Sequence, residues 1–183
     1  MIGLRVVLTA LFASLALLMA PAAAQEVTAR DRGQIEARVD GLRAVVTSGD
    51  FAATLDVTPP ALRAALAARF GLSETDLRTA MAEAMAPLME SVTLVSFDID
   101  LDAAAARTTP DGARTYLMIP TTTIMDVAEI GRLRVLSDTL ALEEGGDWYL
   151  IRVEEEFQRT MLEQVYPEFV GVAFPPGTTE LVE

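Results

Sequence analysis

The spacing of apolar residues changes once along this chain, at Val92, and that change limits the fold more than any other feature. Before it, apolar positions recur every three or four residues, as along one side of an α-helix. After it, they alternate with polar positions, as in a strand with one buried and one solvent-facing side. Helices followed by strands predict an α+β domain in which N-terminal helices pack on a curved, cone-like antiparallel sheet, with a C-terminal helix at the end.

Three helices are predicted before the change of period. The first runs from Asp31 to Gly49, because glycine is the usual residue where a helix ends. The second includes Pro59 and Pro60, which a first helical turn tolerates, and has Thr58 as its expected N-cap. The inward positions of these two helices are Ile35, Val39, Leu42, Val46, Leu62, Leu66 and Phe70.

The third predicted helix begins after Ser73, whose hydroxyl can cap its first turn. Leu77, Met81 and Met85 share one side of it and are expected in the core. Pro87 should end or kink this helix, because proline lacks the backbone N–H that a helix interior requires.

The alternation that starts at Val92 predicts the first of four antiparallel strands. Its aspartates are expected to face solvent. Its inward positions are Val95, Phe97, Ile99 and Leu101.

Three more strands follow along the chain. Residues 103–112 predict a turn, and residues 114–125 a strand in which Pro120 must lie at an edge or a bulge. A third strand over 132–143 joins a fourth over 148–153 through a tight turn, so these two must be antiparallel neighbours.

The acidic run Glu154-Glu155-Glu156 opens the last predicted helix, since negative charge is favourable at a helix N-terminus. Residues 25–169 are expected to form one domain, and residues 170–183 an extended, loose tail. The inward positions of the last helix are Phe157, Met161, Val165 and Phe169.

The first 24 residues are typical of a secretory signal peptide. Arg5 precedes an apolar run over 6–20, and small residues lead to a cleavage site after Ala24. As a helix, that run would span only about 22 Å of a hydrocarbon core of about 30 Å. The sequence therefore predicts a periplasmic or secreted protein with no stable membrane insertion.

The composition excludes several chemistries. The chain has no His and no Cys, which rules out His-containing triads, thiol nucleophiles, disulfides and Cys/His zinc sites. A net charge of −13 argues against a nucleic-acid partner. Asp98, Asp100 and Asp102 lack the glycine and glutamate that a calcium loop needs, so neither a metal nor a cofactor is expected.

The order of elements and the segment Gly145-Gly146-Asp147-Trp148-Tyr149 resemble the nuclear transport factor 2-like family, also called the cystatin-like cone. The resemblance covers residues 31–166. It implies a cone whose concave sheet face, closed by the first helices, forms a pocket. It implies no single activity, because this fold hosts isomerases, hydratases, scaffolds and binding modules.

The preferred hypothesis is a non-catalytic module that holds an apolar small molecule or an envelope protein in the concave face. Its expected ligand-binding residues offer an aromatic and aliphatic lining without a convergent acid and base. They are Phe97, Tyr116, Met118 and Trp148.

The alternative is a His-independent lyase or isomerase, with Asp138 as base and Tyr116 as hydrogen-bond donor. A cross-strand pair with arginine is the simpler explanation for Asp138. A homodimer through the sheet is a further prediction, since Tyr149, Ile151 and Val153 would suit a buried sheet face.

Overall fold

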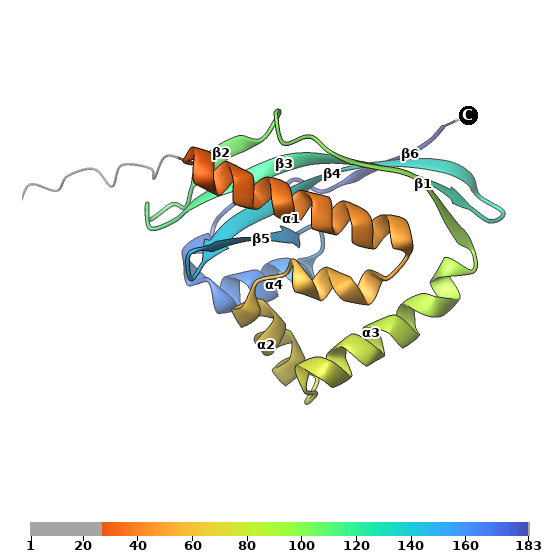
Figure 1. Cartoon of the computed structure of the whole chain (residues 1–183), viewed down its shortest axis with the longest axis horizontal. Coiled ribbons are helices and arrows are strands. Elements are labelled where there is room, and N and C mark those ends of the chain that lie inside the picture. Colours follow the sequence, from red (N-terminus) through yellow and green to blue (C-terminus); the bar gives the residue numbers. More distant parts are fainter. Residues whose placement is uncertain (1–26, 183) are drawn as a thin grey trace, which may run out of the picture.

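The computed structural model describes residues 27–182, so the signal peptide predicted over 1–24 lies outside the described residues. Helices pack against a strongly curled antiparallel sheet (Figure 1), and the predicted α+β class is confirmed. The helices are α1 (Ala29–Ser48), α2 (Pro60–Arg69), α3 (Glu74–Met89) and α4 (Glu156–Val165), with the short 3-10 helices η1 (Phe51–Asp56) and η2 (Pro167–Phe169). The strands are β1 (Val92–Ile99), β2 (Ala105–Thr108), β3 (Thr115–Val127), β4 (Gly131–Glu144), β5 (Asp147–Arg152) and β6 (Thr178–Leu181).

The ends of α1 follow from its capping residues. The Thr28 hydroxyl accepts a hydrogen bond from the Asp31 backbone N–H at 3.2 Å, and the Asp31 carboxylate accepts one from the Thr28 N–H at 2.9 Å. This capping box starts the helix two residues before the expected Asp31. Gly49 ends it, as predicted, with a left-handed φ of 76°.

The N-cap expected for α2 is wrong. Pro59 occupies that position, and the Thr58 hydroxyl instead donates to the Thr54 carbonyl at 2.9 Å. The first turn of α2 receives its acceptor from another part of the chain: Glu144 Oε1, at the end of β4, accepts from the Ala61 N–H at 3.2 Å.

The third helix begins as predicted and runs further than its proline indicated. The Ser73 hydroxyl accepts from the Asp76 N–H at 3.1 Å, and α3 continues past Pro87 to Met89. Leu77 is buried, while Met81 and Met85 are only half-buried. The side of α3 that was expected in the core is therefore partly open.

The sheet has the order β1-β3-β4-β5, with β2 also paired to β3 and β6 also paired to β4. The turn expected over 103–112 contains β2. Pro120 lies inside β3, at the point where the partner of β3 changes from β2 to β1. Its carbonyl accepts from the Asp100 N–H at 2.9 Å, so its missing N–H faces this change of partner and not the ladder with β4.

The inward position expected for Val95 is wrong. A β-bulge lies between Leu94 and Ser96, and it leaves Val95 44% exposed. Because a bulge reverses the alternation, Leu94 lies on the same face as Phe97 and Ile99, as their partners on β3 show.

Both faces of the sheet are covered where β3, β4 and β5 meet. We call them the α1 face and the α4 face, after the helices that pack on them. The core of the α1 face consists of Ile35, Val39, Val57, Ile99, Leu117, Ile119, Ala141, Trp148 and Leu150. The core of the α4 face includes Leu62, Tyr116, Met118, Leu140, Leu142, Ile151, Val153, Met161, Leu162, Tyr166 and Phe169.

The end of the chain departs from expectation in two places. Phe157 does not face the core: it lies in the first turn of α4, is 43% exposed, and has its ring 6.4 Å from that of Phe70 at the end of α2. The segment after residue 169 is extended, and its residues Thr178–Leu181 pair with β4 as strand β6.

Phe169 and Phe157 give a direct test of the packing. Phe169 is fully buried and touches Tyr116, Tyr166 and Phe174, so we expect Phe169→Ala to lower the free energy of unfolding by about 3–5 kcal/mol. Phe157→Ala should cost less, about 1 kcal/mol, because that side chain is 43% exposed and belongs to no core cluster of the described chain. Urea denaturation followed by circular dichroism measures both values, and equal losses would contradict this placement of the two rings.

Candidate functional site

The four residues expected to bind a ligand do not surround one pocket. Tyr116 and Met118 are buried in the core of the α4 face. Phe97 and Trp148 pack in the core of the α1 face. The structure therefore brings these residues together in pairs on opposite sides of the sheet, where each contributes to packing.

Trp148 also connects α1 to β5. Its indole N–H donates to Asp31 Oδ1 at 3.0 Å, and Arg38 Nε donates to the Trp148 carbonyl at 2.9 Å. The Arg38 guanidinium lies 4.7 Å from the centre of the Tyr149 ring, a cation–π contact. These bonds hold α1 along the edge strand of the sheet.

The catalytic pair considered above is far apart. Tyr116 and Asp138 point to the same face, but Asp138 lies opposite Pro120, four residues along β3 from Tyr116, a separation of about 14 Å. Within residues 27–182 Asp138 has no ion pair, since Arg132 contacts Asp126 and Arg134 contacts Glu180. The cross-strand arginine pair expected for Asp138 is thus not formed.

The tyrosine and carboxylate that do meet are Tyr166 and Glu144. The Tyr166 hydroxyl donates to Glu144 Oε2. The other oxygen of this carboxylate, Oε1, accepts from the Ala61 N–H of α2. The Arg114 guanidinium lies 5.1 Å from the centre of the Tyr166 ring, and its Nε donates to Glu168 Oε1 at 2.6 Å. Burial and the neighbouring carboxylate both raise the pKa of Tyr166, so its hydroxyl stays protonated and acts as a donor.

This network joins four elements and has no free acceptor aimed at a ligand. Glu144 ends β4, Ala61 lies in the first turn of α2, Tyr166 follows α4 and Arg114 precedes β3. Arg114 also donates to the Glu143 carbonyl. Because each of these groups already has a partner, the arrangement serves to position α2 and α4 against the sheet.

The ion pair Arg32–Asp102 borders an open hollow at the start of α1. The hollow has a volume of about 260 Å³ and is lined mainly by apolar residues, with Arg32 Nη2 2.5 Å from Asp102 Oδ1. A second hollow of about 290 Å³ lies where η1, α2 and α3 meet, and the pairs Arg63–Glu74 and Arg78–Asp56 occupy its wall. Both arginines of the second hollow also donate to carbonyls of η1, so their charge is used in packing.

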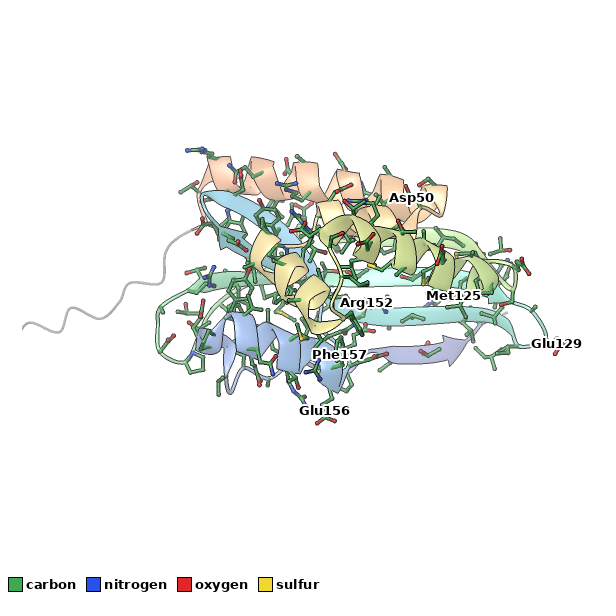
Figure 2. All side chains as sticks on the ribbon, turned by 90° about the horizontal axis from the view of Figure 1, so that it is seen from below. Asp50, Met125, Glu129, Arg152, Glu156 and Phe157 are labelled. Carbon is green, nitrogen blue, oxygen red and sulfur yellow. The ribbon has the colours of Figure 1, made fainter. Side chains whose placement is uncertain are left out.

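The far half of the α1 face is covered less completely. There, Leu133, Val135 and Ser137 of β4 and Met125 of β3 are half-buried, although the two strands pair throughout this region. Arg152 of β5 lies on the same face, opposite Thr139. We call these five residues the inner strip. In Figure 2, Arg152, Met125 and the hairpin residue Glu129 follow one another along the sheet.

The floor beside the inner strip carries hydroxyl groups. Thr121, Thr123 and Thr139 are buried, and the Thr121 and Thr139 hydroxyls are hydrogen-bonded to each other at 2.7 Å. Mutual pairing satisfies these two groups without a charge. The strip is therefore polar at the Arg152 end and aliphatic at the Leu133 end.

Neither a metal cluster nor a membrane helix is found in the part of the chain that the structure describes. Over 27–182, no three acidic side chains gather closely enough to hold an ion. Within the same residues, no helix has both the length and the hydropathy to cross a bilayer.

Comparisons with family models, curated proteins and solved structures found no significant match.

Sequence reasoning missed the two most informative groups of polar residues. Glu144 and Tyr166 are 22 positions apart, and no local pattern connects them. Arg152 had a usable signal: it continues the alternation of Trp148 and Leu150, which places a charge on an otherwise buried face.

The Tyr166 network gives a stability prediction with a matched control. Tyr166→Phe removes the hydroxyl that donates to Glu144, and we expect a loss of about 1–3 kcal/mol in the free energy of unfolding. Tyr149→Phe should change stability little, because that ring contacts Arg38 through its face and its hydroxyl makes no hydrogen bond within the described residues. Urea denaturation at neutral pH measures both free energies of unfolding. A Tyr166→Phe variant as stable as the wild type would contradict the network.

The same pair predicts a pH dependence. The pKa of Tyr166 is raised in the folded protein above its usual 10.0. The contribution of its hydroxyl to the free energy of unfolding is therefore complete below pH 10 and is lost as the pH rises above 10. The difference in stability between the wild type and Tyr166→Phe should therefore shrink above pH 10. A difference that stays constant up to pH 11 would show that the two states share one pKa.

Proposed function

We propose that this protein is a non-catalytic binding module that holds an apolar small molecule on the inner strip. The supporting observation is that the packed cores stop halfway along the α1 face. Leu133, Val135 and Met125 belong to no core cluster of the described chain, yet they lie on the face that α1 covers.

The energetics favour a ligand at this place. Fully burying one aliphatic side chain is worth about 1.5–3 kcal/mol, and the strip residues are only half-buried. An apolar ligand that completed their burial would gain this free energy without disturbing the cores, which are already closed.

Helix α3 has a further apolar surface, and β1, which it contacts, is paired with the strand that carries Met125. The α3 residues Met81, Met85 and Met89 are half-buried. Methionine side chains are flexible and polarizable, so they adapt to ligands of different shapes. We propose that α3 borders the bound ligand on the side away from β6.

The catalytic alternative gains no support from the geometry. A lyase or isomerase would need Asp138 and Tyr116 to act on one substrate, but they are about 14 Å apart along the sheet. The inner strip itself contains one ionisable side chain, Arg152, and no carboxylate that could serve as the base.

The cellular location of the protein and its family are further proposals. The predicted signal peptide supports a periplasmic or secreted protein. Helix α1, which packs on one face of a curled sheet, supports the resemblance to the nuclear transport factor 2-like cone. The α1 face then corresponds to the concave face of that family. A dimer through Tyr149, Ile151 and Val153 has less support, because Ile151 and Val153 are buried beneath α4 of the same chain.

Two neighbouring residues of β4 test the proposed function. Val135 lies on the inner strip, and Leu136 points to the opposite face. With the neutral dye Nile red as probe, we expect the wild type to enhance its fluorescence and Val135→Gln to weaken binding about tenfold, the equivalent of roughly half the burial of one side chain. Leu136→Gln should bind as the wild type does.

The contrary results are equally clear. A wild-type protein that leaves the dye unchanged, or two variants that lose binding equally, would refute a site on the inner strip. If Val135→Gln fails to fold by circular dichroism, Met125→Gln replaces it, since Met125 lies on the same face one strand away.

A further inference from the structure

We propose that the ligand of the inner strip is a single-chain amphiphile, whose carboxylate binds Arg152 and whose apolar chain lies along Ser137, Val135, Leu133 and Met125. This inference rests on the proposed function and names its ligand class. It is carried by the position of one arginine, the order of residues along the strip, and the length of the strip.

Arg152 is placed to bind an anion at one end of the strip. It lies opposite Thr139 on β4, on the same face as the strip, and 46% of its side chain is exposed. Its Nε lies 2.9 Å from Glu154 Oε2. Among residues 27–182, Glu154 is its one ion-pair partner and contacts Nε, so the two terminal nitrogens can bind a second carboxylate through two parallel bonds.

The polarity of the strip changes in one direction only. Starting from Arg152, the α1 face of β4 shows Thr139, then Ser137, then Val135, then Leu133. On the neighbouring strand β3, Thr121 and Thr123 precede Met125. A ligand with a charged head and an apolar tail matches this gradient, whereas a uniformly apolar ligand would leave the polar end unused.

The length of the strip fits an extended chain. Leu133 lies six positions before Thr139, which corresponds to about 20 Å along an antiparallel strand. Leu181 of β6 lies opposite Leu133 and is largely exposed, so it prolongs the apolar end at the margin of the sheet.

The surrounding charges make Arg152 necessary for an anion. The whole chain carries a net charge of −13, and Glu154, Glu155 and Glu156 follow Arg152 directly. Glu154 is paired with Arg152, while Glu155 and Glu156 are exposed at the start of α4. Without the guanidinium, the field at this end of the strip would repel a carboxylate.

The test compares two probes of equal chain length, dodecanoate and dodecanol, both used below the concentrations at which they aggregate. Arg152→Gln should weaken dodecanoate binding at least about tenfold and leave dodecanol within about twofold, because only the acid bonds to the guanidinium. The matched control is Arg134→Gln. Arg134 lies on β4 on the opposite face, its side chain is 43% exposed, and it too pairs with a glutamate, Glu180. The Arg134→Gln variant should bind both probes as the wild type does.

Each outcome distinguishes the two proposals. If wild type binds both probes but Arg152→Gln binds dodecanoate unchanged, the head-group assignment is wrong and the proposed function stands. If the wild type binds neither probe and does not bind Nile red, the proposed function itself fails. Arg152→Lys, which keeps the charge but not the two parallel bonds, should restore part of the dodecanoate affinity; equal losses for Arg152→Lys and Arg152→Gln would contradict a role for the charge.

Discussion

Four consecutive residues of β3, Tyr116–Ile119, are buried, and the rest of the structure depends on this fact. Successive side chains of a strand point to opposite faces, so a buried run requires cover on both sides of the sheet. Helix α1 supplies it on one side, and α4 with α2 on the other. The two core clusters exist because this part of β3 has no solvent-facing side.

The other half of β3 obeys a different constraint. Beyond Pro120 the partner of β3 changes from β2 to β1. There, only Thr121 and Thr123 are buried, and the other residues up to Val127 are half-buried. A strand that is closed at one end and half-covered at the other places the packed core and the proposed binding strip in the same sheet. The core then holds in place the same strands that carry the strip at their hairpin end.

The sequence predicted the fold class because it depends on local periods. The change at Val92 marks the first strand correctly, and Gly49 marks the end of α1. It did not predict the bulge at Val95, because one extra residue reverses the alternation without any change in residue type. Helical spacing alone predicts Phe157 inward, but spacing does not tell where the sheet beneath the helix ends.

The candidate site was harder to predict for the same reason. Tyr116, Met118, Phe97 and Trp148 were correctly recognised as apolar residues of strands, but their division between two faces depends on the register of three strands. The inner strip is made of residues that look ordinary in sequence. They stand out only because the cores stop before reaching them.

The cap of α2 has a consequence for the order in which the chain folds. The carboxylate that accepts the Ala61 N–H belongs to Glu144, 83 positions later. A chain that emerges from its N-terminus has already released α2 before this acceptor exists, and Pro59 supplies no side-chain oxygen in its place. The Ala61 N–H can therefore receive its intramolecular acceptor only after β4 is in place, and until then it bonds to water, so the cap of this early helix is completed late, by a strand that lies far along the chain.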